Sequence, residues 1–323
     1  MTETQSTPTQ SQTQHSDPAE ARASTFRAGL VAVVGRPNVG KSTLMNRLIG
    51  QKLSITSPKP QTTRHRIQGV LTEAQAQWVF VDTPGMHLGA QKSLNRMMNR
   101  AATTALSGVD VVVMVIEAGR WTQEDQVVAD KCRASDLPVV VAVNKIDLFA
   151  DKYALLPYLE SVSEKTGFEP LIPISAYNQS GVAPLKSAVM AHLPQQPPLF
   201  ESDTLTDRST RFLAAEMIRE KLMRNLGAEV PYGVSVEIEQ FQWDAEAARF
   251  EVHGLIWVER PGQKMIVIGK KGQLIKQVGI QARKDMMHLL DARVHLELWV
   301  KVKENWSDDD RALASLGYDP DLV

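Results

Sequence analysis

The stretch Val31–Thr43 reads VAVVGRPNVGKST, and the rest of the chain can be interpreted outward from it. An apolar run stops at Gly35, and Gly40–Ser42 follows at the spacing G-x-x-x-x-G-K-[ST] of a phosphate-binding loop. A buried strand would deliver the chain to this turn, where the glycines let backbone amides approach phosphate groups closely. The sequence therefore predicts a strand, a phosphate loop and then a helix over residues 43–49.

The polar residues of this loop have separate expected roles. The ammonium group of Lys41 can reach the β- and γ-phosphates of a nucleotide, and the Ser42 hydroxyl can ligate Mg²⁺. The N-terminus of the following helix also favours an anion. The predicted phosphate-loop residues are Gly35, Arg36, Pro37, Asn38, Val39, Gly40, Lys41, Ser42 and Thr43.

Composition restricts the class of protein. The chain has 323 residues, 43% of them hydrophobic, so it can form more than one packed core. Its net charge of -1 argues against a protein whose whole surface is basic and binds nucleic acid, but it is compatible with a local basic patch. The single cysteine, Cys132, excludes an internal disulfide and fits a reducing compartment. Because no apolar run approaches the ~18 residues of a membrane span and no signal-peptide pattern is present, we expect a cytoplasmic protein.

The first domain is predicted over residues 26–193, after a Thr-, Gln-, Ser- and Pro-rich tail over residues 1–25 that is expected to be disordered. Continuous Val- and Ile-rich runs alternate there with helix-like segments, which indicates an α/β fold with a mostly parallel sheet covered by helices. One short connection instead predicts an antiparallel hairpin at the sheet edge. The hairpin strands are Ile67–Thr72 and Trp78–Val81, and the other runs are Leu30–Val34, Val109–Ile116, Val139–Val143 and Leu171–Ile174.

A proline-rich segment marks the boundary to a second domain. Residues 194–206 are predicted as a linker and residues 207–303 as a compact α+β domain of order α-β-β-α-β. Residues 304–323 are expected to form a polar tail that is loosely docked. The elements predicted in the second domain are a helix over Asp207–Leu226, capped by Asp207 or Ser209, strands over Val234–Gln240 and Arg249–Val258, a helix over Gln273–Leu290 and a strand over Val294–Val302.

Three stretches at predicted strand ends favour a guanine nucleotide. The first stretch is Asp82-Thr83-Pro84-Gly85. The Asp82 carboxylate is expected to bind magnesium through water, and the Gly85 amide can contact a γ-phosphate. In Asn144-Lys145-Ile146-Asp147, the Asp147 carboxylate can accept from two guanine donors that adenine lacks. Ser175-Ala176 can present a backbone amide to the guanine O6. Together with the phosphate loop, these stretches predict a GTPase.

The polar segment Ser54–Arg66 is predicted to be a switch that closes a threonine over magnesium when a γ-phosphate is present. We favour Thr63, with Thr62 as the alternative, so that Ser42, Thr63 and Asp82 complete the metal site. Gly85–Asn99 is the second candidate switch. The predicted catalytic residues are Lys41, Thr63 and Gly85.

The residue after Gly85 is Met86, where many regulatory GTPases place a water-orienting glutamine. Hydrolysis is therefore expected to be slow in isolation, on the order of 10⁻⁴–10⁻³ s⁻¹. A backbone group, a cation or a partner must position the water instead. Asn38 matches the residue that related GTPases use to hold K⁺ near the phosphates, and the alternative is an asparagine that only stabilises the turn.

The second domain contains a glycine-centred loop, Val267–Lys276, that reads VIGKKGQLIK. A G-x-x-G turn between helical segments, with lysines at its tip, is typical of a KH module, which grips about four nucleotides of single-stranded nucleic acid. Residues 260–284 contain seven basic residues and no acidic one, which predicts a local positive face. Ile268, Leu274, Ile275 and Val278 are expected to floor the groove, and Trp243, Trp257 and Trp299 to lie in the core. The predicted RNA-binding residues are Ile268, Gly269, Lys270, Lys271, Gly272, Lys276 and Arg283.

The wording GRPNVGKS, then QTTRHR, then DTPGMH resembles the Era family of P-loop GTPases over about residues 28–318. The resemblance implies a type II KH domain after the GTPase domain. It implies that Lys41 and Ser42 act on phosphate and magnesium, and that Asn144, Asp147 and Ala176 read guanine. It also implies binding to the 3′ end of small-subunit (16S) ribosomal RNA during assembly of the 30S particle.

Other function classes compete with this interpretation. A membrane-associated signalling GTPase would use the basic stretch around residues 270–284 on anionic lipid, peripherally at the inner face of the cell membrane. An RNA motor is disfavoured by the guanine-reading stretch Asn144–Asp147 and by the lack of a second predicted NTPase domain, and a tandem GTPase is excluded by the single phosphate loop. We expect a monomer that uses GTP or GDP with Mg²⁺, and K⁺ if Asn38 holds it.

Overall fold

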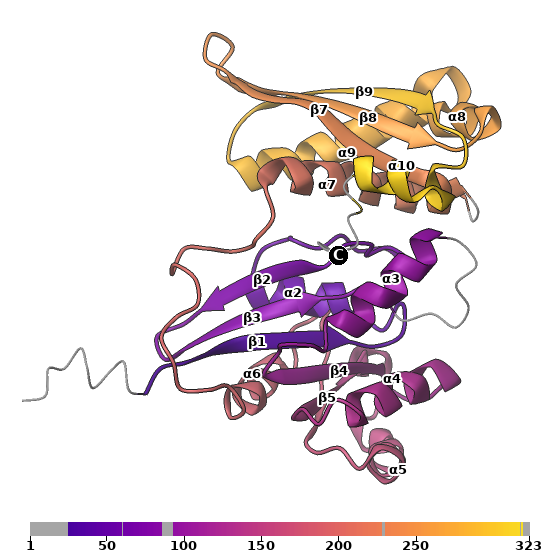
Figure 1. Ribbon diagram of the computed structural model, residues 1–323. Helices are drawn as coiled ribbons and strands as arrows, with labels where there is room; N and C mark the ends of the chain where they lie inside the picture. Colours follow the sequence, from indigo (N-terminus) through magenta and orange to yellow (C-terminus); the bar gives the residue numbers. More distant parts are fainter. Residues whose placement is uncertain (1–24, 60, 86–92, 228–229, 317, 319–323) are drawn as a thin grey trace, which may run out of the picture.

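The computed structural model describes residues 25–59, 61–85, 93–227, 230–316 and 318. Two modules lie one above the other, each with its own sheet and helices (Figure 1). The connection between them runs along one side of the molecule and enters a helix that faces the lower module (Figure 1). Residues 1–24 of the predicted disordered tail and residues 86–92 of the second candidate switch, including Met86, lie outside the described residues.

The first module is built on a six-stranded sheet of order β2-β3-β1-β4-β5-β6. All neighbours are parallel except β2 and β3, which pair antiparallel at one edge, so both the parallel sheet and its edge hairpin are confirmed. The strands are β1 (Arg27–Val34), β2 (Ile67–Thr72), β3 (Ala76–Asp82), β4 (Val111–Glu117), β5 (Val139–Asn144) and β6 (Leu171–Pro173), and the helices are α2 (Lys41–Ile49), α3 (Ser93–Thr104), α4 (Gln123–Arg133), α5 (Leu156–Thr166) and α6 (Val182–Met190).

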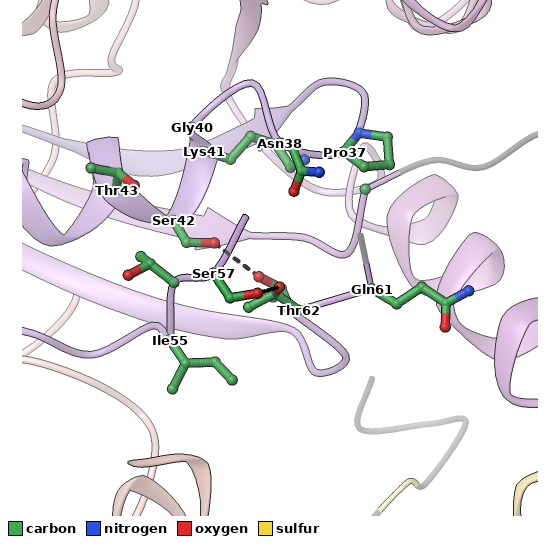
Figure 2. A pocket seen from close by; sticks show the side chains of 13 residues that line it. Pro37, Asn38, Gly40, Lys41, Ser42, Thr43, Ile55, Ser57, Gln61 and Thr62 are labelled. Carbon is green, nitrogen blue, oxygen red and sulfur yellow. Dashed lines mark hydrogen bonds between the residues drawn. The ribbon is translucent and has the colours of Figure 1, made fainter. Parts of the chain in front are cut away.

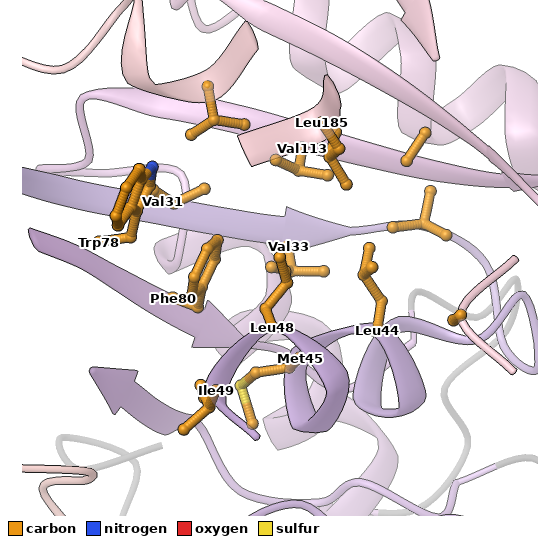
Figure 3. Packing of buried hydrophobic residues seen from close by; sticks show 14 of the residues in the cluster. Val31, Val33, Leu44, Met45, Leu48, Ile49, Trp78, Phe80, Val113 and Leu185 are labelled. Carbon is orange, nitrogen blue, oxygen red and sulfur yellow. The ribbon is translucent and has the colours of Figure 1, made fainter. Parts of the chain in front are cut away.

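The core explains why the strands are continuously apolar. Every residue of β3 and β5 is buried, because helices cover both faces of the sheet. Helix α2 inserts Leu44, Met45 and Leu48 between itself and β1 and β3, where they meet Phe80 (Figure 3). This packing fixes the start of α2 against the end of β1, and the phosphate loop lies between these two points.

The second module has a three-stranded sheet, β7 (Val234–Asp244), β8 (Arg249–Val258) and β9 (Val294–Val302), with β9 parallel to β8. Its helices are α7 (Thr210–Asn225), α8 (Pro261–Ile268) and α9 (Gln273–Leu290). The predicted order lacked α8, which begins at Pro261 and whose Gln263 side chain accepts from the Glu259 and Arg260 amides at 2.8 and 3.1 Å. Ser209, not Asp207, caps α7, since its hydroxyl accepts from the Phe212 amide at 3.2 Å.

The segment over residues 194–206 is attached to the first module along its length, and we call it the strap. The Ala28 amide donates to Pro194 O at 3.1 Å, and the Val70 amide donates to Leu205 O at 2.9 Å. Between them, the Gln77 side chain bonds the backbone of Leu199 and Phe200. The strap therefore belongs structurally to the edge of the first sheet.

The prediction of a loosely docked C-terminal tail was wrong. Trp306 and Leu313 are fully buried and Tyr318 is nearly so, and they pack against Leu94 of α3. Helix α10 (Asp310–Ser315) lies in this cluster, between the two modules (Figure 1). The sequence around it is polar, but its few large apolar residues share one face, and that face meets both modules.

Two smaller observations complete the fold. Cys132 is buried, and burial raises the pKa of its thiol to about 12, which fits an inert structural cysteine. Among the described residues, every helix is too short or too polar to cross a membrane.

Candidate functional site

The phosphate loop needs glycine at two positions. Gly40 has φ of 104°, and a Cβ there would lie 2.3 Å from the Asn144 side-chain nitrogen. Gly35 has φ of 152°, and a Cβ there would lie 2.4 Å from Val115 O. Both positive angles are in a region that favours glycine, and both positions are in close contact with a neighbouring strand end. The loop thus packs directly on the carboxyl ends of β4 and β5.

Lys41 closes across the loop that carries it. Its ammonium group donates to Gly35 O and Arg36 O, both at 3.0 Å, and the side chain is buried. Burial lowers the pKa of Lys41 to about 8, although the nearby carboxylate of Asp82 opposes the shift. A cation held this way over backbone oxygens is suited to exchange them for phosphate oxygens.

The two candidate switch threonines point in different directions. The Thr63 hydroxyl lies 2.8 Å from the Ser42 hydroxyl, whereas Thr62 bonds Ser57 at 2.7 Å and Lys59 O at 2.6 Å within its own segment. Figure 2 shows the phosphate loop and this segment facing each other across the pocket. The geometry therefore favours Thr63 over Thr62 as the partner of Ser42.

Asp82 completes a group suited to magnesium. Its side chain is fully buried at the end of β3, and among the described residues neither carboxylate oxygen makes a well-directed hydrogen bond, although the Ser42 and Ser54 hydroxyls and the Thr83 amide lie near enough to favour its charged form. Burial raises the pKa of Asp82, and the charge of Lys41 opposes that shift. Adjacent oxygen ligands of an octahedral Mg²⁺ lie about 3 Å apart, which the Ser42 and Thr63 hydroxyls match. These residues fit a Mg²⁺ ion.

Gly85 lies against the phosphate loop. A Cβ at this position would be 2.9 Å from the Pro37 ring, so only glycine allows the approach. The preceding Thr83 hydroxyl donates to Val33 O at 3.0 Å and ties the segment to β1. The backbone of Gly85 thus lines the same pocket as Lys41 and Ser42.

Arg36 was predicted among the phosphate-loop residues, but its side chain points away from the pocket. It is buried in an ion-pair cluster, with Nη2 2.5 Å from Glu117 and Nε 3.1 Å from Asp125. Asp125 also completes a capping box with Thr122 at the start of α4. The sequence analysis missed Glu117 and Asp125, although the T-x-x-D pattern before α4 could have indicated the cap. Only the backbone of Arg36 remains a candidate phosphate contact.

Asn144 joins the phosphate loop to the guanine-reading loops. Its side chain is buried, donates to Val39 O at 2.7 Å and accepts from the Ala176 amide at 2.9 Å. Ser175 donates to the exposed Asp147 carboxylate at 2.5 Å, which sets the orientation of that carboxylate. Lys145 pairs with Glu117 at 3.1 Å. Asn144 therefore links the phosphate loop to the Ser175-Ala176 loop. The Ala176 amide, which was predicted to contact the guanine O6, donates here to the Asn144 side-chain oxygen.

The loop predicted to hold K⁺ is in direct contact with the switch. The Asn38 side-chain nitrogen donates to Pro58 O at 2.9 Å, and Asn38 itself has φ of 62°. This contact joins the loop to the switch segment and does not decide between the K⁺ ligand and the turn-stabilising alternative.

The glycine-centred loop of the second module projects its lysines into solvent. Gly269 has φ of 73° and a Cβ there would lie 2.7 Å from the Leu274 side chain, so the turn packs tightly on α9. Gly272 also has a positive φ, of 74°, but faces open space. Lys270 and Lys271 between them are exposed. The backbone is thus open to a ligand strand on the side of Gly272.

A groove beside this loop runs between α9 and β9. Val278, predicted for its floor, is instead fully buried in the core, because it lies on the opposite face of α9 from the groove. Ile275, Lys276 and Arg283 do line it, and the sequence analysis missed the rest. The groove residues are Ile275, Lys276, Gly279, Ile280, Arg283, His295, Leu296 and Leu298.

The expectation of three core tryptophans was wrong, because Trp243, Trp257 and Trp299 all lie outside the buried core. Trp243 and Trp299 are 52% and 42% exposed, and each packs edge-on against one ring, of Phe250 and His253 respectively. Trp257 donates to Glu237 at 3.0 Å and has Lys301 near its ring. Trp257 and Trp299 alternate with the apolar residues that face the helices, so they lie on the other face of the sheet. Trp243 lies opposite Phe250 on the helix-facing side, near the end of β7.

The fold and these two sites define a P-loop GTPase module joined to a KH module. Residues 30–145 match the family of 50S ribosome-binding GTPases, and residues 229–307 match the KH domain family. GTPase Era of Yersinia enterocolitica is 53% identical over 294 residues, which cover 91% of this chain and 97% of the relative, and that of Yersinia pestis is equally similar. The chain belongs to the Era family of GTPases, and it is an enzyme that binds and hydrolyses GTP.

Solved structures agree over the whole fold. A variant of Aquifex aeolicus Era bound to GDP and AlF4⁻ is 37% identical, with a TM-score of 0.88, and the match covers 91% of this chain and 99% of that one. The same values apply to Era in complex with MgGDPNP and nucleotides 1506–1542 of 16S ribosomal RNA. Both modules and their arrangement are therefore shared with these relatives.

Proposed function

We propose that this chain is a GTP-driven switch that binds the 3′ end of 16S ribosomal RNA and acts in assembly of the 30S subunit. The observation that carries the proposal is the position of Thr63. Its hydroxyl lies 2.8 Å from the Ser42 hydroxyl of the phosphate loop, and the switch segment that contains Thr63 also contacts the KH module. The relative solved with MgGDPNP and 16S ribosomal RNA nucleotides supports the same combination of ligands.

The proposed nucleotide site assigns one role to each region. Lys41 and the amides of residues 35–43 hold the phosphates, and Asp147 with Ser175-Ala176 reads guanine. Ser42, Thr63 and, through water, Asp82 would hold Mg²⁺, which supplies charge neutralisation on the β- and γ-phosphates. The Gly85 amide is proposed to contact the γ-phosphate. When guanine enters, the Ala176 amide would be shared between Asn144 and the guanine O6.

The proposed RNA site combines the glycine-centred loop with the groove beside α9. Lys270, Lys271, Lys276 and Arg283 are exposed and neutralise the backbone of a single strand. Ile275 and Ile280 offer an apolar floor to unstacked bases. Base identity is read in such modules by contacts at base edges.

The finer assignments of ions and partners are also proposals. Asn38 is proposed to hold K⁺ with its side-chain oxygen, and equal hydrolysis rates in K⁺ and Na⁺ would exclude this. We propose a cytoplasmic monomer whose basic face touches the inner membrane only peripherally. Sedimentation measures the oligomeric state, and anionic vesicles competed by RNA oligonucleotides separate the lipid and RNA interpretations.

The main experiment uses two single substitutions in the full chain. Lys41→Ala should abolish hydrolysis, since it removes the cation from the phosphate site, and should leave binding of a 16S 3′-end oligonucleotide to the KH face. Gly272→Asp should weaken that binding while hydrolysis persists, because it adds a negative charge where the chain faces open space.

The matched control is Gly272→Asn, which has the same shape and backbone strain without the charge. It should bind the oligonucleotide much better than Gly272→Asp does. Equal affinity of the two variants and the original chain would show that the loop does not hold RNA. A titration without preference for guanosine over adenosine nucleotides would refute the GTPase assignment.

A further inference from the structure

The backbone next to Thr63 is held by a residue of the KH module. The Arg219 Nη2 atom, on α7, donates to Thr62 O at 2.6 Å. Arg219 is only 1% exposed, so this bond is protected from water. The peptide that carries this carbonyl links Thr62 to Thr63, whose hydroxyl faces Ser42 on the other side of the segment.

Arg219 is itself fixed in place by a two-point contact. Its Nε and Nη2 atoms donate to the two carboxylate oxygens of Glu216, at 2.7 and 2.6 Å. Both side chains are buried one turn apart on α7. Burial alone would raise the pKa of Glu216, but the charge of Arg219 and their hydrogen bonds lower it below its ordinary value. The pair is therefore charged and rigid.

Other contacts hold the switch segment on both sides of Thr63. Arg64 donates to Val234 O, at the start of β7, at 2.8 Å and to Tyr232 O, just before that strand, at 3.0 Å. Before Thr63, the Thr56 amide and hydroxyl donate to Glu220 of α7, at 3.1 and 3.2 Å. The segment that must close over magnesium is thus anchored in the second module on both sides of Thr63, and Lys59, which donates to Leu226 O, adds a further contact.

We propose that Arg219 is a positioning residue for GTP hydrolysis, which the KH module supplies to the nucleotide site of the same chain. By holding the Thr62 carbonyl, Arg219 orients the adjoining Thr63 so that its hydroxyl faces Ser42. This inference rests on the proposed role of Thr63 and adds to it a residue that touches neither nucleotide nor metal. A chain whose modules are displaced from each other loses this support and hydrolyses GTP more slowly.

The test compares Arg219→Met with Arg211→Met in the full chain. Arg211 lies on the same helix and also donates to backbone oxygens, Ile238 O at 3.0 Å and Glu239 O at 2.9 Å, but these belong to its own module. Both changes remove one positive charge from α7 and a bond to a carbonyl. Only the first removes a bond to the switch segment.

The readouts are single-turnover hydrolysis and the affinities for GDP and for a magnesium-bound, non-hydrolysable GTP analogue. Arg219→Met should slow hydrolysis and weaken analogue binding about ten- to hundredfold, the range of one lost hydrogen bond to a charged group. GDP affinity should stay within about twofold. Arg211→Met should change none of these quantities.

Arg219→Met leaves the Glu216 charge buried and can impair folding. The double variant with Glu216→Gln removes both charges, and it should keep the melting temperature while losing the same analogue binding. Hydrolysis at the original rate in the double variant would overturn the inference, and so would a parallel loss of GDP affinity. Failure of the original chain to hydrolyse GTP would instead refute the proposed function.

Discussion

Replacing Arg36 by methionine separates two roles that the sequence cannot distinguish for this residue of the phosphate loop. A phosphate ligand would lose nucleotide affinity when removed. The structure instead places the guanidinium in a buried cluster with Glu117 and Asp125. We therefore expect Arg36→Met to reduce the stability of the GTPase module and to change GDP affinity by less than about threefold.

The size of the loss follows from what remains after the change. Breaking a buried ion pair on one side costs about 3–5 kcal/mol, because the other charge is left uncompensated. Asp125 keeps two hydrogen bonds from Thr122, at 2.9 and 2.7 Å, and Glu117 keeps Lys145 at 3.1 Å. We therefore expect the lower end of that range, about 3 kcal/mol of unfolding free energy.

Urea denaturation without nucleotide measures this loss, and titration with a fluorescent GDP measures affinity. The control is the double variant Arg36→Met with Asp125→Asn, which removes the uncompensated charge but keeps an oxygen for the Thr122 cap. It should recover part of the lost stability. A fall of more than about tenfold in GDP affinity with unchanged stability would refute our account of Arg36.

Three further outcomes are expected. Because burial lowers the pKa of Lys41 to about 8 and bound phosphate favours the charged form, GDP binding at pH 8 should take up about half a proton and none at pH 6.5. Calorimetry in buffers of different ionisation enthalpy measures this uptake, and Lys41→Arg should remove it. In nucleotide-free protein the buried charge of Lys41 destabilises the fold, so the free energy of unfolding should rise as the pH increases from 8 to 10.5 and the group loses its proton. Thr63→Val should weaken binding of a magnesium GTP analogue about tenfold or more without affecting GDP. Thr62→Val removes a hydroxyl that bonds only its own segment and should not weaken analogue binding, so equal effects of the two changes would remove the assignment of Thr63. Leu313→Ala should destabilise the docked C-terminal cluster by about 2–4 kcal/mol, seen as faster proteolysis after Trp306, and unchanged digestion would contradict its burial.

Much of the fold could be predicted because local signals agree with the final packing. The edges of β2, β8, α9 and β9 were predicted to the residue, since turn residues or glycines flank each of them. The phosphate loop was predicted from its spacing together with the apolar run before it and the helical pattern after it, because its glycines and lysine are required by contacts that any such loop makes.

The missed features depend on partners far away in the sequence. The direction of the Arg36 side chain is set by Glu117 and Asp125, which lie on other elements. The docking of Trp306 and Tyr318 depends on a surface that forms only when the modules meet. The burial of Val278 requires knowing which face of α9 meets the sheet, and its sequence is apolar on more than one face.

The strap limits how far the two modules can travel. Just after the strap, Arg208 makes the last anchor to the first module, since its Nε donates to Arg66 O at 3.1 Å, and α7 begins at Thr210. An extended chain spans about 3.5 Å per residue, so the connection from Arg208 to Thr210 spans less than about 10 Å. Unless the strap detaches from the sheet, the KH module can swivel but cannot drift away. Under the proposed function, an RNA end captured by the KH module stays beside the nucleotide held by the GTPase module.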